Sequence, residues 1–179
     1  MNRIKIDDHY TMVQMKLTRR DENIFFKLWT NSYDYLKQSK MYQSGLEKKR
    51  EVFTYYRSLV GKKAQWIYEP IFKIVNANNT PVGFAGLINY RDGVELVLFF
   101  IPTFQHLKLD NAAIRLLIAH HQGCHLNETL YFKVAKNNQE LTCLLKDIGF
   151  NLIGEVESYY SLNEDDMCWK LLFNYQTKK

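Results

Sequence analysis

The chain has 179 residues, of which 46% are hydrophobic and 24% are charged, and this balance excludes a disordered or low-complexity protein. Its longest unbroken apolar run, residues 96–101, is far shorter than the ~20 residues of a membrane-spanning helix, so no membrane association is expected. The formal net charge of +5 is scattered along the sequence and forms no basic stripe, which makes nucleic-acid binding the least favoured class of function.

Residues 1–8 lack an apolar segment long enough for a secretory signal, so we expect a cytoplasmic protein. An odd number of widely spaced cysteines predicts reduced thiols: Cys124, Cys143 and Cys168. A further cluster consists of His120, His121, Cys124 and His125. Adjacent helix positions point about 100° apart, so these side chains cannot easily share one ion. We expect them to lie at the surface or to cap a helix end, and we expect no metal.

The first third of the chain predicts one strand and two helices. Residues 10–17 alternate as a strand does, and Asp21 and Glu22 then open a helix with apolar residues at helical spacing. Residues 46–59 form a second amphipathic helix, which Gly61 ends.

The middle of the chain predicts three consecutive strands. Residues 66–75, 82–89 and 94–101 show strand-like patterns separated by turn residues, and Pro102 closes the third. A helix over 110–121 follows, in which Asp110 is a good candidate for the N-cap.

The last third predicts a strand over 130–134, a helix over 137–146 and two strands over 151–160 and 167–173. No linker or change in composition divides the chain, so residues 1–179 read as one domain. The order of elements indicates an α+β sheet protein with one central helix crossover.

The late helix carries the most specific pattern. Asn138, Leu145, Gly149 and Phe150 match the motif Asn-x-x-Ser-x-x-x-Leu-x-x-x-Gly-Phe, with Leu141 at the serine position. This motif and the order of elements, which covers nearly the whole chain, resemble the GNAT N-acetyltransferase superfamily. More narrowly, they resemble the branch that acetylates ribosomal-protein N-termini and similar amines.

The resemblance implies α/β/α layers around a mixed, mostly antiparallel sheet of about seven strands with about four helices. It also implies acetyl-CoA as co-substrate, with the pantetheine arm bonded between two parallel strands that splay apart, residues 99–101 opposite residues 132–135. Family members hold the CoA pyrophosphate on a glycine-rich loop at a helix N-terminus. The residues expected to bind the cofactor are Phe100, Ile101, Gln105, His106, Lys108, Leu109, Asp110 and Asn138.

The phosphate loop of this sequence departs from the family pattern. Gln105 matches, but His106 and Lys108 replace glycines and Asp110 replaces a small residue. Two interpretations stay open. Lys108 could supply a charge in place of backbone contacts, or Asp110 could repel the phosphates or block the anion site as a helix cap.

For catalysis, Glu95 is the expected general base, at the position of a family glutamate, with Glu69 as a second candidate. The family's usual acids are missing, because Leu141 and Leu145 stand at those positions. Tyr159 or Tyr160 could substitute. An acidic final hairpin, with Glu155, Glu157 and residues 164–166, would attract a cationic amine.

The leading hypothesis is therefore an N-acetyltransferase in which a primary amine of a small molecule or of a protein or peptide N-terminus attacks acetyl-CoA directly. The alternative is a catalytically impaired module of the same fold that binds CoA or another protein. A homodimer is a further expectation, because exposed strand edges often pair in this family.

Overall fold

The computed structural model describes residues 3–31, 49–60, 71–90, 93–104, 107–124, 128–136, 138–158 and 168–175. Within these ranges, eight strands form one sheet in the order β1-β2-β3-β4-β5-β6-β8-β7. They are β1 (Arg3–Lys5), β2 (Tyr10–Gln14), β3 (Phe72–Asn76), β4 (Pro81–Tyr90), β5 (Gly93–Phe100), β6 (Thr129–Ala135), β7 (Asn151–Ser158) and β8 (Cys168–Tyr175). Neighbouring strands run antiparallel except β5 and β6, which run parallel.

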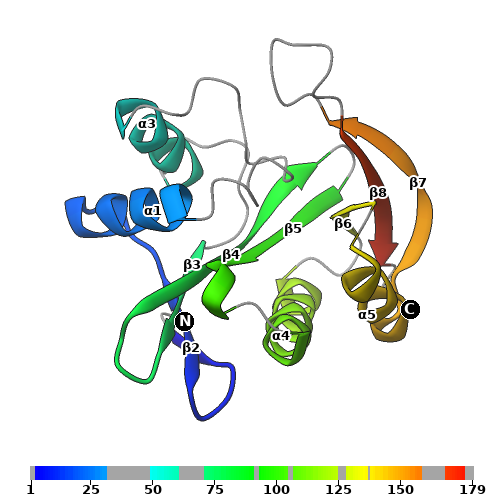
Figure 1. Ribbon diagram of the computed structural model, residues 1–179, viewed down its shortest axis with the longest axis horizontal. Helices are drawn as coiled ribbons and strands as arrows, with labels where there is room; N and C mark the ends of the chain where they lie inside the picture. The colour runs from blue at the N-terminus through cyan, green and yellow to red at the C-terminus, as the bar shows by residue number, and fades with distance from the viewer. Residues whose placement is uncertain are drawn as a thin grey trace.

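Helices cover both faces of this sheet. Those of the described ranges are α1 (Arg19–Asn31), α3 (Lys49–Val60), α4 (Leu107–Cys124) and α5 (Gln139–Ile148), and a 3₁₀ turn (Pro102–Phe104) follows β5. The α1 and α3 helices pack on one face, and α4 and α5 pack on the other (Figure 1). This is the expected α+β class with α/β/α layers. The sheet has one strand more than expected, because β1 pairs with β2.

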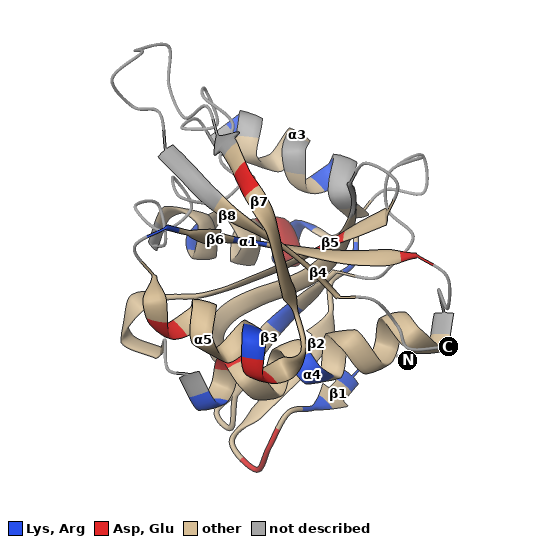
Figure 2. Ribbon diagram, turned by 90° about the vertical axis from the view of Figure 1, so that its right-hand side faces the viewer, with Lys and Arg blue, Asp and Glu red and all other residues tan. Residues whose placement is uncertain are grey.

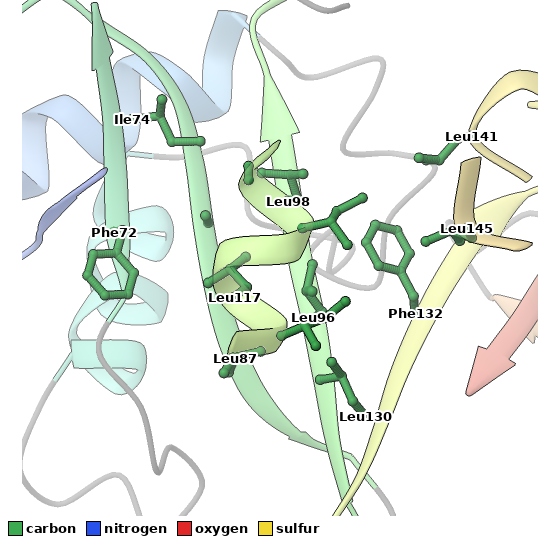
Figure 3. Packing of buried hydrophobic residues seen from close by; sticks show 14 of the residues in the cluster. Phe72, Ile74, Leu87, Leu96, Leu98, Leu117, Leu130, Phe132, Leu141 and Leu145 are labelled. Carbon is green, nitrogen blue, oxygen red and sulfur yellow. The ribbon is translucent and has the colours of Figure 1, made fainter. Parts of the chain in front are cut away.

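The alternation of β5 decides which helix layer each of its side chains meets. The even-numbered residues pack toward α4, as Figure 3 shows for Leu96 and Leu98 beside Leu117. The odd-numbered Phe99 belongs instead to the cluster of α1 and α3. Since side chains alternate along a strand, the side chain of Glu95 projects to the α1 and α3 face.

Two buried carboxylates form ion pairs that attach α1 to its neighbours. Asp21 and Glu22 lie in the first turn of α1, where the helix dipole favours carboxylates. Asp21 pairs with Lys73 of β3, and Glu22 pairs with Arg57 of α3. The hydrogen bond from Arg57 holds the pKa of Glu22 below its ordinary value. These pairs fix α1 and α3 over the face to which Glu95 projects.

Local signals define α5 at both ends. The Asn138 side-chain oxygen accepts a hydrogen bond from the Leu141 N–H at 3.0 Å, which makes Asn138 the N-cap. Gly149 ends the helix with φ of 111°, a left-handed conformation that favours glycine. The predicted helix followed by a Gly-Phe turn is confirmed, two residues further along the chain than expected.

Other boundaries also differ from the predictions. The first predicted strand ends at Gln14 rather than at residue 17, and α4 begins at Leu107 rather than at Asp110. Several predicted features lie outside the described residues: the start of the second helix at 46–48, Gly61, residues 66–70 of the first of the three consecutive strands, and the acidic residues 164–166 of the final hairpin. None of the described helices is long and apolar enough to cross a membrane.

Candidate active site

The parallel strands β5 and β6 pair over only a short stretch and then separate. Their register joins Gly93 with Thr129, Val94 with Leu130 and Glu95 with Tyr131. Beyond Glu95, β5 remains paired with β4 while β6 diverges from it, as Figures 1 and 3 show. The backbone of β5 beyond this point therefore has no ladder partner on the β6 side among the described strands.

Gly93 allows the close approach of the two strands at the start of their paired stretch. A Cβ atom at Gly93 would lie 2.1 Å from the Thr129 carbonyl oxygen, so only glycine fits there. The strands thus meet tightly at one end and diverge toward the C-terminal end of β5, which leads into α4. An extended polar ligand could bond to the unpaired backbone as an added strand would.

The expected cofactor residues on β5 differ in their backbone partners. The Ile101 N–H donates to the Val82 carbonyl at 2.9 Å, so it is already bonded to β4. Because successive backbone groups of a strand point to opposite edges, the N–H and C=O groups of Phe100 and Leu98 face β6. The side chain of Phe100 is buried in the core on the α4 face. The backbone groups of Phe100 therefore point toward β6, and a cofactor contact from them stays a prediction.

Glu95 is buried at the point where the strands separate. Its carboxylate Oε2 accepts a hydrogen bond from the Lys133 Nζ at 2.8 Å, and both side chains are at most 7% exposed. Lys133 lies on β6, two residues after Tyr131, and so projects to the same face. The role of Glu95 as a general base stays a prediction, and the structure adds a cation beside it.

Lys133 was not among the residues expected from the sequence. The signal was weak, because Lys133 alternates with Leu130, Phe132 and Val134 and so occupies a position where an exposed polar residue is ordinarily expected. Nothing in that pattern reveals that Lys133 meets Glu95, which lies 38 residues earlier. The register of a parallel ladder across a helix crossover brings the two residues together.

At the start of α4, Lys108 is exposed, Leu109 is buried in the core and Asp110 is 8% exposed. The expected N-cap role of Asp110 is wrong, because Asp110 is the fourth residue of the helix. The apolar stripe of α4 already begins at Leu109 and continues through Ala113 and Leu117. Burial raises the pKa of Asp110 from 3.8 to about 7.

Five of the predicted site residues lie outside the described residues: Gln105, His106, Tyr159, Tyr160 and Glu69. The capping bond already engages the side-chain oxygen of Asn138, so a cofactor contact from this residue stays a prediction.

The two α5 side chains at which the resemblance implied an acid point away from Glu95. Leu141 and Leu145 are buried with Phe132 and Phe150 in the cluster of α4 and α5. Neither residue carries a proton to donate. The described part of α5 therefore presents only apolar core side chains at the two positions where the family usually keeps an acid.

His120 and His121 of α4 each contact another residue of the fold. His121 is fully buried, which corrects its expected surface position, and its Nε2 lies 3.1 Å from the Glu128 carbonyl. The His120 ring packs edge-on against Phe72. Over the described ranges, no group of three His, Cys, Asp or Glu side chains could hold a metal ion.

The charges of the described residues are dispersed. Lys and Arg lie on separate elements, α3, α4 and β1 among them (Figure 2). In the predicted acceptor region, Glu155 of β7 pairs with Lys136 at 3.0 Å on the surface.

No family model matches the sequence, and no curated protein matches it either. Solved structures do resemble it. The ribosomal-protein-S5-alanine acetyltransferase from Vibrio fischeri is 12% identical, with 99% of this chain and 97% of that chain covered and a TM-score of 0.74. The spermidine N-acetyltransferase from Vibrio cholerae, in complex with CoA and spermine, is 17% identical, with coverage of 93% and 95% and a TM-score of 0.72.

The ribosomal L7/L12 α-N-protein acetyltransferase RimL is 12% identical, with 97% of this chain and 93% of that chain covered and a TM-score of 0.73. At such low identity, these likenesses establish the fold and nothing finer. They extend over nearly the whole chain, including the parallel pair at the centre of the sheet. The chain therefore has the fold of the GNAT acetyltransferases, with a buried carboxylate where its two parallel strands separate.

Proposed function

We propose that this protein is an N-acetyltransferase that moves an acetyl group from acetyl-CoA onto a primary amine of a small molecule or of a protein or peptide N-terminus. The observation that carries the proposal is the separation of β5 and β6 directly after Glu95. This separation leaves backbone donors and acceptors for the pantetheine arm beside a buried carboxylate. A neighbour of the same fold was solved with CoA and spermine, which supports CoA as the ligand class.

The topology orients the cofactor. The β5 strand leads through the 3₁₀ turn into α4, whose N-terminus is the expected site of the pyrophosphate. The arm would then extend from α4 back along residues 96–100, which span ~16 Å at ~3.3 Å per residue. Its thioester end would lie at the closed end of the separation, beside Glu95.

In this arrangement the chain supplies binding, orientation and proton transfer. Backbone groups of Leu98 and Phe100 align the pantetheine arm, and the burial of the Glu95 site excludes water from the thioester. Glu95 accepts the proton that the attacking amine loses as its nitrogen bonds to the acetyl carbon. We further propose a cytoplasmic location.

The test is a calorimetric titration of the wild-type protein with acetyl-CoA, with CoA and ATP as controls, followed by a screen of amine acceptors. Micromolar binding of acetyl-CoA and CoA, but not ATP, together with amine acetylation would support the proposal. An absence of binding at millimolar acetyl-CoA would refute it.

The alternative, a module of this fold that binds CoA or a protein without transfer, has one observation in its favour. Leu141 and Leu145, at the positions of the usual acids, are core residues. Binding of CoA without acetylation of any amine in the screen would favour this alternative. A homodimer through the edge strand β7, where Leu152 and Ile153 are each 47% exposed, would appear as a doubled mass in light scattering.

A further inference from the structure

The ion pair between Lys133 and Glu95 differs from the surface ion pairs of this protein. Its two side chains are 7% and 3% exposed, whereas Lys5 and Asp8 form a pair of similar length, 2.7 Å, at 68% and 88% exposure. A buried ion pair is often no more stabilising than apolar residues of the same size, because both charges lose their hydration. Stability alone therefore gives little reason for a buried ammonium at position 133.

The location of the pair points to chemistry. Glu95 is the last β5 residue in register with β6, and Lys133 is the next same-face residue of β6 beyond that register. The two side chains thus bridge β5 and β6 where the strands begin to separate. Under the proposed function, this is where the thioester meets the acceptor amine.

The reaction also needs a proton donor, which the two α5 positions where an acid was expected do not provide. Acetyl transfer breaks the bond between carbon and sulfur, and the departing CoA thiolate must gain a proton. Leu141 and Leu145 have no proton to give, and both lie in the core on the opposite face of the sheet. The Lys133 ammonium lies on the same face of the sheet as Glu95, the expected base, and donates a hydrogen bond to its carboxylate.

We propose that Lys133 donates this proton, so that Lys133 and Glu95 act as one proton-relay pair; this inference rests on the proposed acetyl transfer. The amine nitrogen bonds to the acetyl carbon, Glu95 takes the proton from that nitrogen, and the C–S bond breaks with its electron pair on sulfur. Lys133 Nζ then protonates the thiolate. A proton passes from Glu95 to Lys133 along their 2.8 Å hydrogen bond and restores the pair.

The coupling has a physical basis. While Glu95 is ionised, its charge stabilises the buried ammonium and retains the proton on Lys133. Once Glu95 has been neutralised by the proton of the amine, the ammonium loses the stabilising negative charge of Glu95, which favours its deprotonation. Attack of the amine thus activates the acid at the moment when the thiolate leaves.

The decisive variant is Lys133→Arg. Arginine retains the positive charge and can still pair with Glu95, but it does not lose its proton in proteins. If Lys133 donates a proton, Lys133→Arg lowers kcat at least 100-fold, within the range of general acid catalysis, while the Kd for acetyl-CoA and the melting temperature stay near wild type. The matched control is Lys5→Arg at the exposed pair with Asp8, for which no change in kcat is expected.

A second set of variants distinguishes loss of catalysis from loss of folding. Lys133→Met removes the ammonium that pairs with the buried Glu95 carboxylate and could unfold the protein, whereas the double variant with Glu95→Gln removes both charges. If the two residues act as one unit, the double variant loses no more kcat than the worse single variant.

The outcomes separate this inference from the proposed function. A wild-type protein that acetylates an amine while Lys133→Arg retains most of its turnover would overturn proton donation by Lys133 and leave the acetyltransferase proposal intact. A wild-type protein that binds no acetyl-CoA would overturn both. Loss of turnover in Lys133→Arg with normal acetyl-CoA binding supports the relay.

Discussion

Replacing Asp110 by asparagine should stabilise this protein in a way that depends on pH. Burial raises the pKa of Asp110 from 3.8 to about 7, so the folded state holds the proton more tightly than the unfolded state. Stability from this group is therefore fully present below pH ~4 and is lost as the pH rises to ~7. An asparagine side chain at this position would have a similar shape and no charge to bury, so the variant avoids this loss.

The expected magnitude follows from the same shift. A change in pKa from 3.8 to about 7 corresponds to ~4 kcal/mol, at ~1.4 kcal/mol for each pH unit. We therefore expect Asp110→Asn to raise the free energy of unfolding by up to ~4 kcal/mol at pH 8 relative to its effect at pH 4.

Urea denaturation of both proteins between pH 4 and pH 8 measures this difference, provided that unfolding is two-state. The control is Glu140→Gln, which replaces an exposed acidic residue in the first turn of α5. It should destabilise by ~0.3–1 kcal/mol through the lost dipole interaction, opposite in sign to Asp110→Asn at pH 8. A difference between Asp110→Asn and wild type that stays constant from pH 4 to pH 8 would refute the reasoning.

Three further predictions concern the site and α5. Glu95→Gln should lower kcat at least 100-fold with little change in the Kd for acetyl-CoA, measured by steady-state kinetics and calorimetry; unchanged turnover would dismiss Glu95 as the base. Lys108→Gly should tighten acetyl-CoA binding if backbone contacts dominate the phosphate site, whereas weaker binding in calorimetry would identify Lys108 as a phosphate ligand. Gly149→Ala should destabilise by ~1–2 kcal/mol because of its positive φ, whereas Gly123→Ala, which meets no atom within 4 Å, should stabilise by ~0.5–1 kcal/mol in the same urea assay.

Local signals in the sequence were sufficient for most of the elements. The α5 helix is an example: Asn138 and Gly149 define its ends through hydrogen bonds within four residues along the chain. Strand alternation likewise predicted β4 and β5 closely. Such features depend on near neighbours, so a sequence pattern contains the information that specifies them.

Boundaries were less accurate where the tertiary core extends an element. The α4 helix begins three residues before the predicted start, because Leu109 adds a turn to the buried stripe of that helix. The sequence suggested instead that Asp110 caps the helix. Only the packing of α4 on the sheet shows that this carboxyl group is inside the protein, and this burial raises its pKa.

The sequence by itself determined the fold class, the order of elements and Glu95 as a candidate base. Only the tertiary structure showed that Lys133 meets Glu95, 38 residues away, and that Leu141 and Leu145 face the opposite side of the sheet. The physical reason is that periodicity and capping act between neighbours along the chain. Contacts across a parallel strand pair depend on a register that the intervening α4 crossover and the packing of both helix layers decide together.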